Sequence, residues 1–252
     1  MTPLHCIRGF VLLAMIAASF PAAAADGSGA QHPKTRVLLV YGGHEFETNQ
    51  FFQIFRDNPQ ITFKAVEHPK AQEWFRPEHS GEFDVLVFYD MWQSMSDEAK
   101  TSLVALLKAG KPLVALHHTL GAFQKWDEYA SIVGGRYHLE KWIDHGVEKP
   151  GSTYHHDVDF TVKVADPNHP VTRSVPDFRI HDETYGGFEV KPESHVLLTT
   201  DEPSNGRNLA WWTTYGPARV VYLQLGHDHQ AYENPNYRKL LAQAIDWAAQ
   251  GQ

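Results

Sequence analysis

The stretch RVLLVYGG, residues 36–43, decides the fold class, because a nearly continuous apolar run leads directly into two glycines. Such a run is typical of a strand that is covered on both faces, and the glycines mark its end. Similar apolar runs recur at residues 85–89 (VLVFY) and 113–116 (LVAL). Strands that are buried on both faces belong mainly to parallel sheets of α/β proteins. The three runs therefore predict a parallel sheet.

Helical patterns separate these runs, at residues 48–55 and 96–109. In the second of them we expect Ser96 to cap the start of the helix and Gly110 to end it. Residues 61–66 (ITFKAV) alternate between apolar and polar, which is typical of an edge or half-exposed strand. This alternation of strands and helices indicates βαβ organisation.

The second half of the chain has a different sequence pattern, with shorter strand-like segments between turns rich in Pro, Gly and Asn. These segments are residues 158–164, 195–199, 208–213 and 219–225. Residues 237–249 carry an apolar face at helical spacing and predict a last helix. No internal repeat interrupts the pattern. We therefore expect one α/β domain over residues 35–252.

The N-terminus has the layout of a secretory signal peptide. Arg8 precedes an apolar run at residues 10–20, and four alanines follow at residues 22–25. We expect a signal peptide over residues 1–25 and a small, polar linker over residues 26–34. Cys6 precedes the apolar run, which is the wrong place for a lipid-anchored cysteine. The mature protein is thus expected to be periplasmic or secreted, without a membrane anchor.

Composition limits the possible partners. Cleavage after residue 25 would leave 21 basic and 30 acidic residues, a net charge near −9. A surface of this sign repels phosphate backbones, so no nucleic-acid binding is expected. The single cysteine lies within the expected signal peptide, so the mature protein would have no thiol. The unusual feature is the content of sixteen histidines, a side chain that serves both as metal ligand and as acid or base.

Several histidines follow directly on the predicted strands. In parallel α/β sheets, ligands bind at the carboxyl ends of the strands. A further segment, residues 181–187, is interpreted as a loop that carries carboxylates and a phenol. The residues singled out in this way are Gly43, His44, Trp92, His117, His118 and His227 at the strand ends, and Asp182, Glu183 and Tyr185 in the expected loop.

Each of these residues also has a structural interpretation. A single histidine after a strand is more often a hydrogen-bonded structural residue. In His117-His118 one ring could enter the core while the other reaches the cleft, with a slight preference for His118 as the cleft residue. Gly43 favours a tight turn over a phosphate loop, because no Gly-x-Gly-x-x-Gly pattern surrounds it. Asp182-Glu183 could be a catalytic pair or a solvated acidic loop, and Trp92 could stack on a sugar or pack at the rim.

The reaction classes that remain are acid/base and metal chemistry. The sequence has no Gly-x-Ser-x-Gly motif and no thiol after a strand, so a triad hydrolase would lack its nucleophile. His44, His118, Glu183 and His227 together would suit zinc, manganese or iron. No His-Glu-x-x-His motif supports such a site locally. A divalent metal such as zinc or manganese, with His44 and His227 as ligands, is thus one hypothesis.

Five segments in order resemble the ThuA-like (trehalose utilisation) family, and the resemblance covers about residues 36–252. The segments are LHHTLGAF (116–123), WDEY (126–129) with Gly134-Gly135, DPNHPVT (166–172), DETY (182–185), and YGPARV (215–220) with LGH (225–227).

The resemblance implies a fold like that of the class I glutamine amidotransferases, a flavodoxin-type three-layer α/β sandwich with a mostly parallel sheet. Where that superfamily has a nucleophilic cysteine after a strand, this sequence has His117-His118, and the superfamily's histidine corresponds to His227. Amidotransferase activity is therefore not expected. The resemblance also implies carbohydrate catabolism, in some members through keto-sugar derivatives of disaccharides.

Together these observations predict an exported enzyme that acts on a glycoside or a 3-keto sugar, a small carbohydrate. His118, Glu183 and His117 are the expected catalytic residues. His118 or Glu183 would be the base, and His44 and His227 the metal ligands or electrophilic donors. The expected substrate contacts are Gly43, Trp92, Asp182 and Tyr185. The alternative is a non-catalytic sugar-binding or accessory protein of the same fold, since no nucleophile is present.

Overall fold

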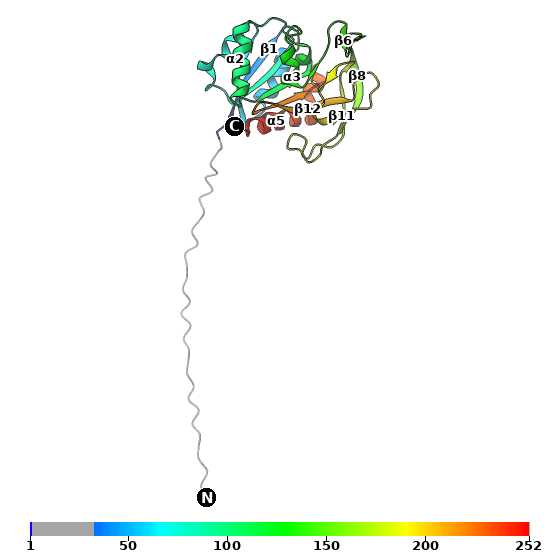
Figure 1. Cartoon of the computed structure of the whole chain (residues 1–252). Coiled ribbons are helices and arrows are strands. Elements are labelled where there is room, and N and C mark those ends of the chain that lie inside the picture. The colour runs from blue at the N-terminus through cyan, green and yellow to red at the C-terminus, as the bar shows by residue number, and fades with distance from the viewer. Residues whose placement is uncertain (2–32, 252) are drawn as a thin grey trace. The chain divides into compact units, whose positions relative to one another are not determined.

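A nine-stranded mixed sheet forms the centre of the computed structural model (Figure 1). The structure describes Met1 and residues 33–251, so the expected signal peptide beyond Met1 and the linker up to residue 32 lie outside the described residues. From Lys34 onward the chain forms one unit. The strands, in spatial order, are β2 (Ile61–Glu67), β1 (Thr35–Gly42), β3 (Val85–Asp90), β4 (Leu113–Leu116), β13 (Ala218–Leu223), β12 (Asn208–Tyr215), β11 (His195–Thr199), β8 (Thr153–Val164) and β9 (Phe178–Gly186).

The first five strands of this order are parallel, and they include the three runs that predicted a parallel sheet. Strands β3 and β4 are buried at every position, and β2 lies at the sheet edge with a partly exposed pattern. Because side chains alternate along a strand, each inner strand supplies apolar groups to both faces. On β1, for example, Leu39 enters one hydrophobic core and Leu38 the other.

Helices cover both of these faces. Helices α1 (Thr48–Arg56), α4 (His229–Glu233) and α5 (Pro235–Ala249) pack into one core. Helices η1 (Lys70–Phe75), α2 (Asp97–Lys108) and α3 (Asp127–Val133) pack into the other, and Figure 1 shows α2 and α5 on opposite sides of the central strands. The result is the three-layer α/β sandwich that the family resemblance implies.

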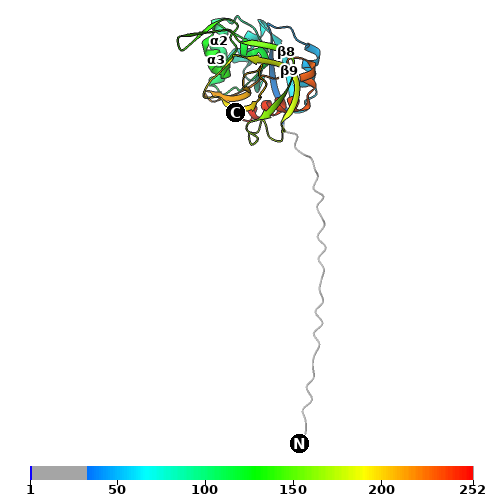
Figure 2. The ribbon, with the colours of Figure 1, turned by 90° about the vertical axis from the view of Figure 1, so that its right-hand side faces the viewer.

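The remaining four strands extend the sheet in antiparallel fashion. Strand β12 pairs with β13, and the order continues through β11 and β8 to β9. Figure 2 shows the long strands β8 and β9 side by side. The interpretation of residues 181–187 as a loop was wrong, since all but the last belong to β9. Its polar residues are buried against the rest of the fold, so they lack the alternation by which a half-exposed strand is recognised.

Short elements complete the fold. They are η2 (Pro77–His79), η3 (His117–Gly121), β5 (Gly135–Arg136) paired with β10 (Glu189–Val190), and the hairpin of β6 (Trp142–Asp144) and β7 (Val147–Lys149).

The predicted helix signals are confirmed at α2. The Ser96 side chain accepts a hydrogen bond from the Ala99 N–H at 3.2 Å, and Gly110 follows the helix with φ +96°. Helix α5 begins two residues earlier than predicted, because Asn234 caps it and Pro235 occupies its first turn. Among the helices that the structure describes, none combines the length and apolarity needed to cross a membrane.

Candidate functional site

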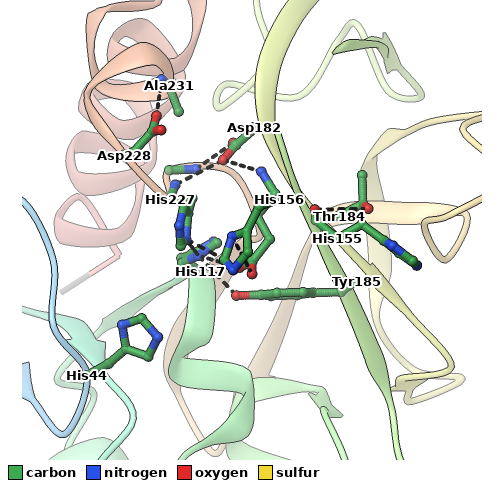
Figure 3. A network of polar contacts seen from close by, with 12 residues as sticks. His44, His117, His155, His156, Asp182, Thr184, Tyr185, His227, Asp228 and Ala231 are labelled. Atoms are coloured by element: carbon green, nitrogen blue, oxygen red, sulfur yellow. Dashed lines mark hydrogen bonds and ion pairs between the residues drawn. The ribbon is translucent and has the colours of Figure 1, made fainter. Parts of the chain in front are cut away.

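The candidate site lies where the carboxyl ends of β4 and β13 meet strand β9. Strands β4 and β13 are parallel neighbours, so the segments that follow them, with His117 and His227, lie together. Strand β9 brings Glu183 and Tyr185 to the same place from the antiparallel half of the sheet. Figure 3 shows the side chains of His117, Tyr185 and His227 gathered at this place.

His117 is held in one orientation by its surroundings. Its backbone has φ +52°, and its buried ring places Nδ1 2.7 Å from the Gln224 carbonyl oxygen. A carbonyl only accepts, so Nδ1 carries the proton and donates it. The other ring nitrogen, Nε2, lies 3.0 Å from the Tyr185 hydroxyl oxygen.

Glu183 and His227 complete a cluster around this nitrogen. The Oε2 atom of Glu183 lies 3.1 Å from His117 Nε2 and 3.4 Å from His227 Nδ1, and the two histidine nitrogens are 3.2 Å apart. The other carboxylate oxygen of Glu183 lies 3.3 Å from Nδ1 of His156. Glu183 is 5% exposed, so the solvated acidic loop that the sequence left open does not exist.

The charges of this cluster depend on one another. Burial by itself would raise the pKa of Glu183, but its hydrogen bonds with His117 and His227 outweigh burial and lower that pKa. Burial would lower the pKa of His227, but its hydrogen bond with Glu183 and the carboxylate charge raise it. Glu183 is therefore ionised, and His227 can carry a proton near neutral pH.

Asp182 has a structural position, contrary to the expected substrate contact. Its side chain is buried and accepts hydrogen bonds from the backbone N–H groups of Gly226 (2.8 Å) and His227 (2.9 Å). It therefore fixes the segment after β13 to strand β9. Both of its oxygens face this backbone, so it does not reach the cavity described below.

His118 and His44 form a second group next to the cluster. Their rings stack with centroids 4.7 Å apart, and the Nδ1 atom of His44 lies 2.6 Å from the Glu45 carbonyl oxygen. His118 is 5% exposed, and neither of its ring nitrogens has a hydrogen-bond partner within the described part of the chain. Burial, together with the neighbouring His117 and His44, holds the pKa of His118 well below its usual value. Its imidazole is therefore neutral.

A cavity of about 270 Å³ opens beside both groups. Tyrosine rings and apolar side chains form much of its wall, and His118 and Glu183 lie in it. The lining residues are His44, Met91, His118, Gly121, Tyr137, Leu139, Tyr154, His156, Glu183 and Tyr185. Pockets of this kind, largely apolar with a few convergent polar groups, are the usual small-molecule sites of proteins.

The structure does not bring Gly43 and Trp92 to this cavity. Gly43 has φ +82°, and a Cβ atom there would lie 2.6 Å from the backbone nitrogen of Trp92. The glycine thus serves the close packing of a turn. The indole of Trp92 stacks on His68 at a centroid distance of 5.8 Å, and Met91, one residue earlier, lines the cavity instead.

Six lining residues were not singled out from the sequence: Met91, Gly121, Tyr137, Leu139, Tyr154 and His156. His156 shows why. The pairing of β8 with β9 shifts register between His155 and Val158, where Asp157 has φ +56°. A β-bulge of this kind re-aims side chains, and it depends on strand pairing that one segment cannot reveal.

The two histidines that the sequence predicts as metal ligands, His44 and His227, do not belong to one cluster. His227 groups with His117 and Glu183, and one ligand atom of each lies within 4.8 Å of the others. His44 does not belong to this group: its ring centroid is 6.5 Å from that of His227, and Figure 3 shows it apart from the crowded rings.

Comparison with known proteins shows the family and the fold of this chain. The sequence profile of the ThuA (trehalose utilisation) family matches residues 36–248. Among solved structures, a ThuA-like protein from Parabacteroides merdae is 21% identical, with TM-score 0.73 over 87% of this chain and 91% of its own. A second one, from Bacteroides uniformis, is 18% identical, with TM-score 0.66 over 91% and 95%.

A protein of a different description shares the same fold. A glutamine amidotransferase from Thermotoga maritima is 13% identical, with TM-score 0.51 over 87% of this chain and 100% of its own. No curated protein sequence matches this chain. At these identities the structural likeness concerns the fold alone, and it confirms the amidotransferase-like architecture.

Proposed function

Because this chain belongs to the ThuA (trehalose utilisation) family, whose members are implicated in carbohydrate metabolism, we propose that it is an enzyme that acts on a glycoside or a 3-keto sugar by acid/base chemistry. One observation carries the proposal. His118 is buried, lines the cavity and has no hydrogen-bond partner for either ring nitrogen among the residues described. Buried polar groups are nearly always paired, so an unpaired imidazole in a cavity wall points to a ligand as its partner.

The cavity suits a sugar. Tyr137, Tyr154 and Tyr185 offer aromatic surface for the apolar face of a sugar ring, while His118, His156 and Glu183 offer groups for its hydroxyls. Its volume of about 270 Å³ is just below the range of typical small-molecule pockets, roughly 300–1,000 Å³. A compact ligand such as one sugar ring fits that size.

The chemistry that we propose begins at a ketone on C3 of the sugar. This ketone acidifies the neighbouring proton on C2, and neutral His118 removes that proton. The C2–H electron pair forms the C1–C2 double bond, and the C1–O pair leaves with the glycosidic oxygen. The protonated His118 then gives this proton to the leaving glycosidic oxygen. Overall, one proton moves from C2 to the leaving group.

The His117–Glu183–His227 cluster supports the negative charge that develops on the ketone oxygen. Glu183 belongs both to this cluster and to the cavity wall, so the cluster borders the reacting space. In the absence of a bound metal ion, the raised pKa of His227 gives the cluster a proton to offer to an oxyanion. Glu183 itself is a weak base, because its neighbours lower its pKa. Glu183 is also engaged by His117 and His227, whereas neutral His118 lines the cavity without a hydrogen-bond partner among the described residues, so we assign His118 as the base.

The test uses the purified protein and a panel of glycosides with their 3-keto derivatives. We expect release of the leaving alcohol from a 3-keto glycoside and, in D₂O, exchange of the C2 proton. His118→Gln should lower kcat by about 10²–10⁴-fold, as expected for loss of general-base catalysis. His79→Ala is the matched control, since His79 pairs with Glu82 away from the cavity.

Two outcomes would contradict this proposal. Saturable sugar binding in calorimetry without product after long incubation would favour the non-catalytic sugar-binding protein. Full activity of folded His118→Gln would remove His118 from the mechanism.

We also propose that the protein is exported to the periplasm or secreted. Support comes from the apolar run at residues 10–20 behind Arg8 and the alanines at residues 22–25. N-terminal sequencing of the protein from its native cells should find a chain that begins close to residue 26. A cytoplasmic protein that begins at Met1 would contradict export.

A further inference from the structure

We propose that His117 Nε2, Glu183 Oε2 and His227 Nδ1 form a binding site for a divalent transition-metal ion at the edge of the cavity. The proposal concerns binding and stands whether or not the substrate is a sugar. The three residues come from three separate parts of the chain, after β4, on β9 and after β13. Their ligand atoms converge only in the folded protein.

The spacing of the three atoms fits one ion. They are separated by 3.1, 3.2 and 3.4 Å. Ligands about 2.1 Å from a zinc ion lie about 3.4 Å apart in tetrahedral geometry and about 3.0 Å apart in octahedral geometry. The observed triangle lies between these values, so an ion can bind with only small movements of the side chains. Three protein ligands leave further positions for water or substrate.

Hydrogen bonds around the three ligand residues fix their positions. Metal-binding histidines usually donate their second N–H to a carbonyl or carboxylate, which fixes the ring. The Nδ1–H of His117 makes this bond to the Gln224 carbonyl oxygen at 2.7 Å. Asp182 fixes the backbone of His227 by accepting its N–H at 2.9 Å. His156 contacts the second oxygen of Glu183, which leaves Oε2 for the ion.

The donor set indicates the class of metal. Two imidazole nitrogens and one carboxylate oxygen suit zinc, iron(II) or manganese, whereas calcium and magnesium prefer oxygen ligands alone. Without an ion, two histidine nitrogens and a carboxylate are crowded within hydrogen-bond distance of one another. A cation between them would replace this contact between two nitrogens with bonds to a common partner.

The experiment measures metal without substrate. The protein, purified without a metal-binding tag, is analysed for elements, dialysed against chelator and titrated with Zn²⁺ and with Mn²⁺ by calorimetry. We expect one ion per chain. Glu183→Gln and His227→Ala should each weaken binding by at least about 100-fold, since even outer-shell changes weaken metal sites by 10–100-fold.

Two further variants make the test specific. His44→Ala should keep the ion, because His44 lies outside the cluster, and His79→Ala should keep it as a surface control. Circular dichroism checks that each variant is folded. Absence of binding to the folded wild type would overturn the proposal, as would loss of binding in His44→Ala or equal binding in all variants. Bound metal without turnover would contradict the proposed function alone, and turnover by metal-free protein would leave that function intact.

Discussion

His118 illustrates how a single side chain can be unfavourable for folding and still belong to the site. Its ring is buried, and neither nitrogen has a partner in the described structure. Leaving a buried polar group unpaired costs roughly 1–3 kcal/mol. At pH 7.5 we therefore expect His118→Leu to unfold in urea with an unchanged or higher free energy of unfolding. A loss above about 2 kcal/mol would mean that the imidazole has a structural partner.

The same residue predicts a dependence of stability on pH. Burial holds the folded-state pKa of His118 below the unfolded value near 6.5, so below that pH the unfolded state binds the proton first and the protein loses stability. Between pH 6.5 and the folded-state pKa, the free energy of unfolding should fall by up to about 1.4 kcal/mol per pH unit from this group. Urea unfolding at pH 7.5 and 5.5 should show a larger loss for the wild type than for His118→Leu. Equal losses would contradict a depressed pKa.

At the scale of elements, the site depends on how closely the ends of the strands pack. The turn after β1 packs against the backbone that follows β3, with room only for glycine at position 43. This contact fixes the segment with His44 relative to Met91, and both residues line the cavity.

Gly43→Ala should therefore be destabilising. The added Cβ would meet the Trp92 nitrogen at 2.6 Å, and the backbone has φ +82°, so we expect a loss of roughly 2–3 kcal/mol in urea unfolding. Gly81→Ala is the matched control, because a Cβ there meets nothing within 4 Å; its change should stay within about 0.5 kcal/mol. Equal behaviour of the two variants would mean that the turn can rearrange freely.

Strand β9 shows that the site also depends on which side of a strand each residue faces. Asp182 and Glu183 are adjacent, yet the first holds the segment after β13 and the second faces the cavity. Their roles differ because successive side chains of a strand point to opposite sides. The bulge in β8 then brings His156 to the far oxygen of Glu183.

At the scale of the whole molecule, the residues from Lys34 onward form their own unit with a hydrophobic core on each face of the sheet. We expect a chain of residues 34–252 to fold by itself, with the circular dichroism spectrum and melting temperature of a chain of residues 26–252. A shift of more than a few degrees, or a lost unfolding transition, would show that preceding residues contribute to stability.

Sequence patterns predicted correctly those elements whose formation depends on residues close together along the chain. The apolar runs predicted β1, β3 and β4, and the capping signals predicted α2. The prediction that His117, His118 and His227 follow strands was equally local, because the end of an apolar run marks the end of a strand. The family resemblance added the amidotransferase-like fold, which the comparisons confirm.

Only the tertiary structure decided which of these residues meet. It placed Glu183 on a strand and joined it to His117 and His227, and it separated His44 from that cluster. It also kept Gly43 and Trp92 out of the cavity and brought His156 in through a bulge. The physical reason is that these contacts join segments distant in sequence through sheet register and close packing. The sequence thus determined the sandwich and the strand ends, and the pairing of β8 with β9 determined which of their side chains face the cavity.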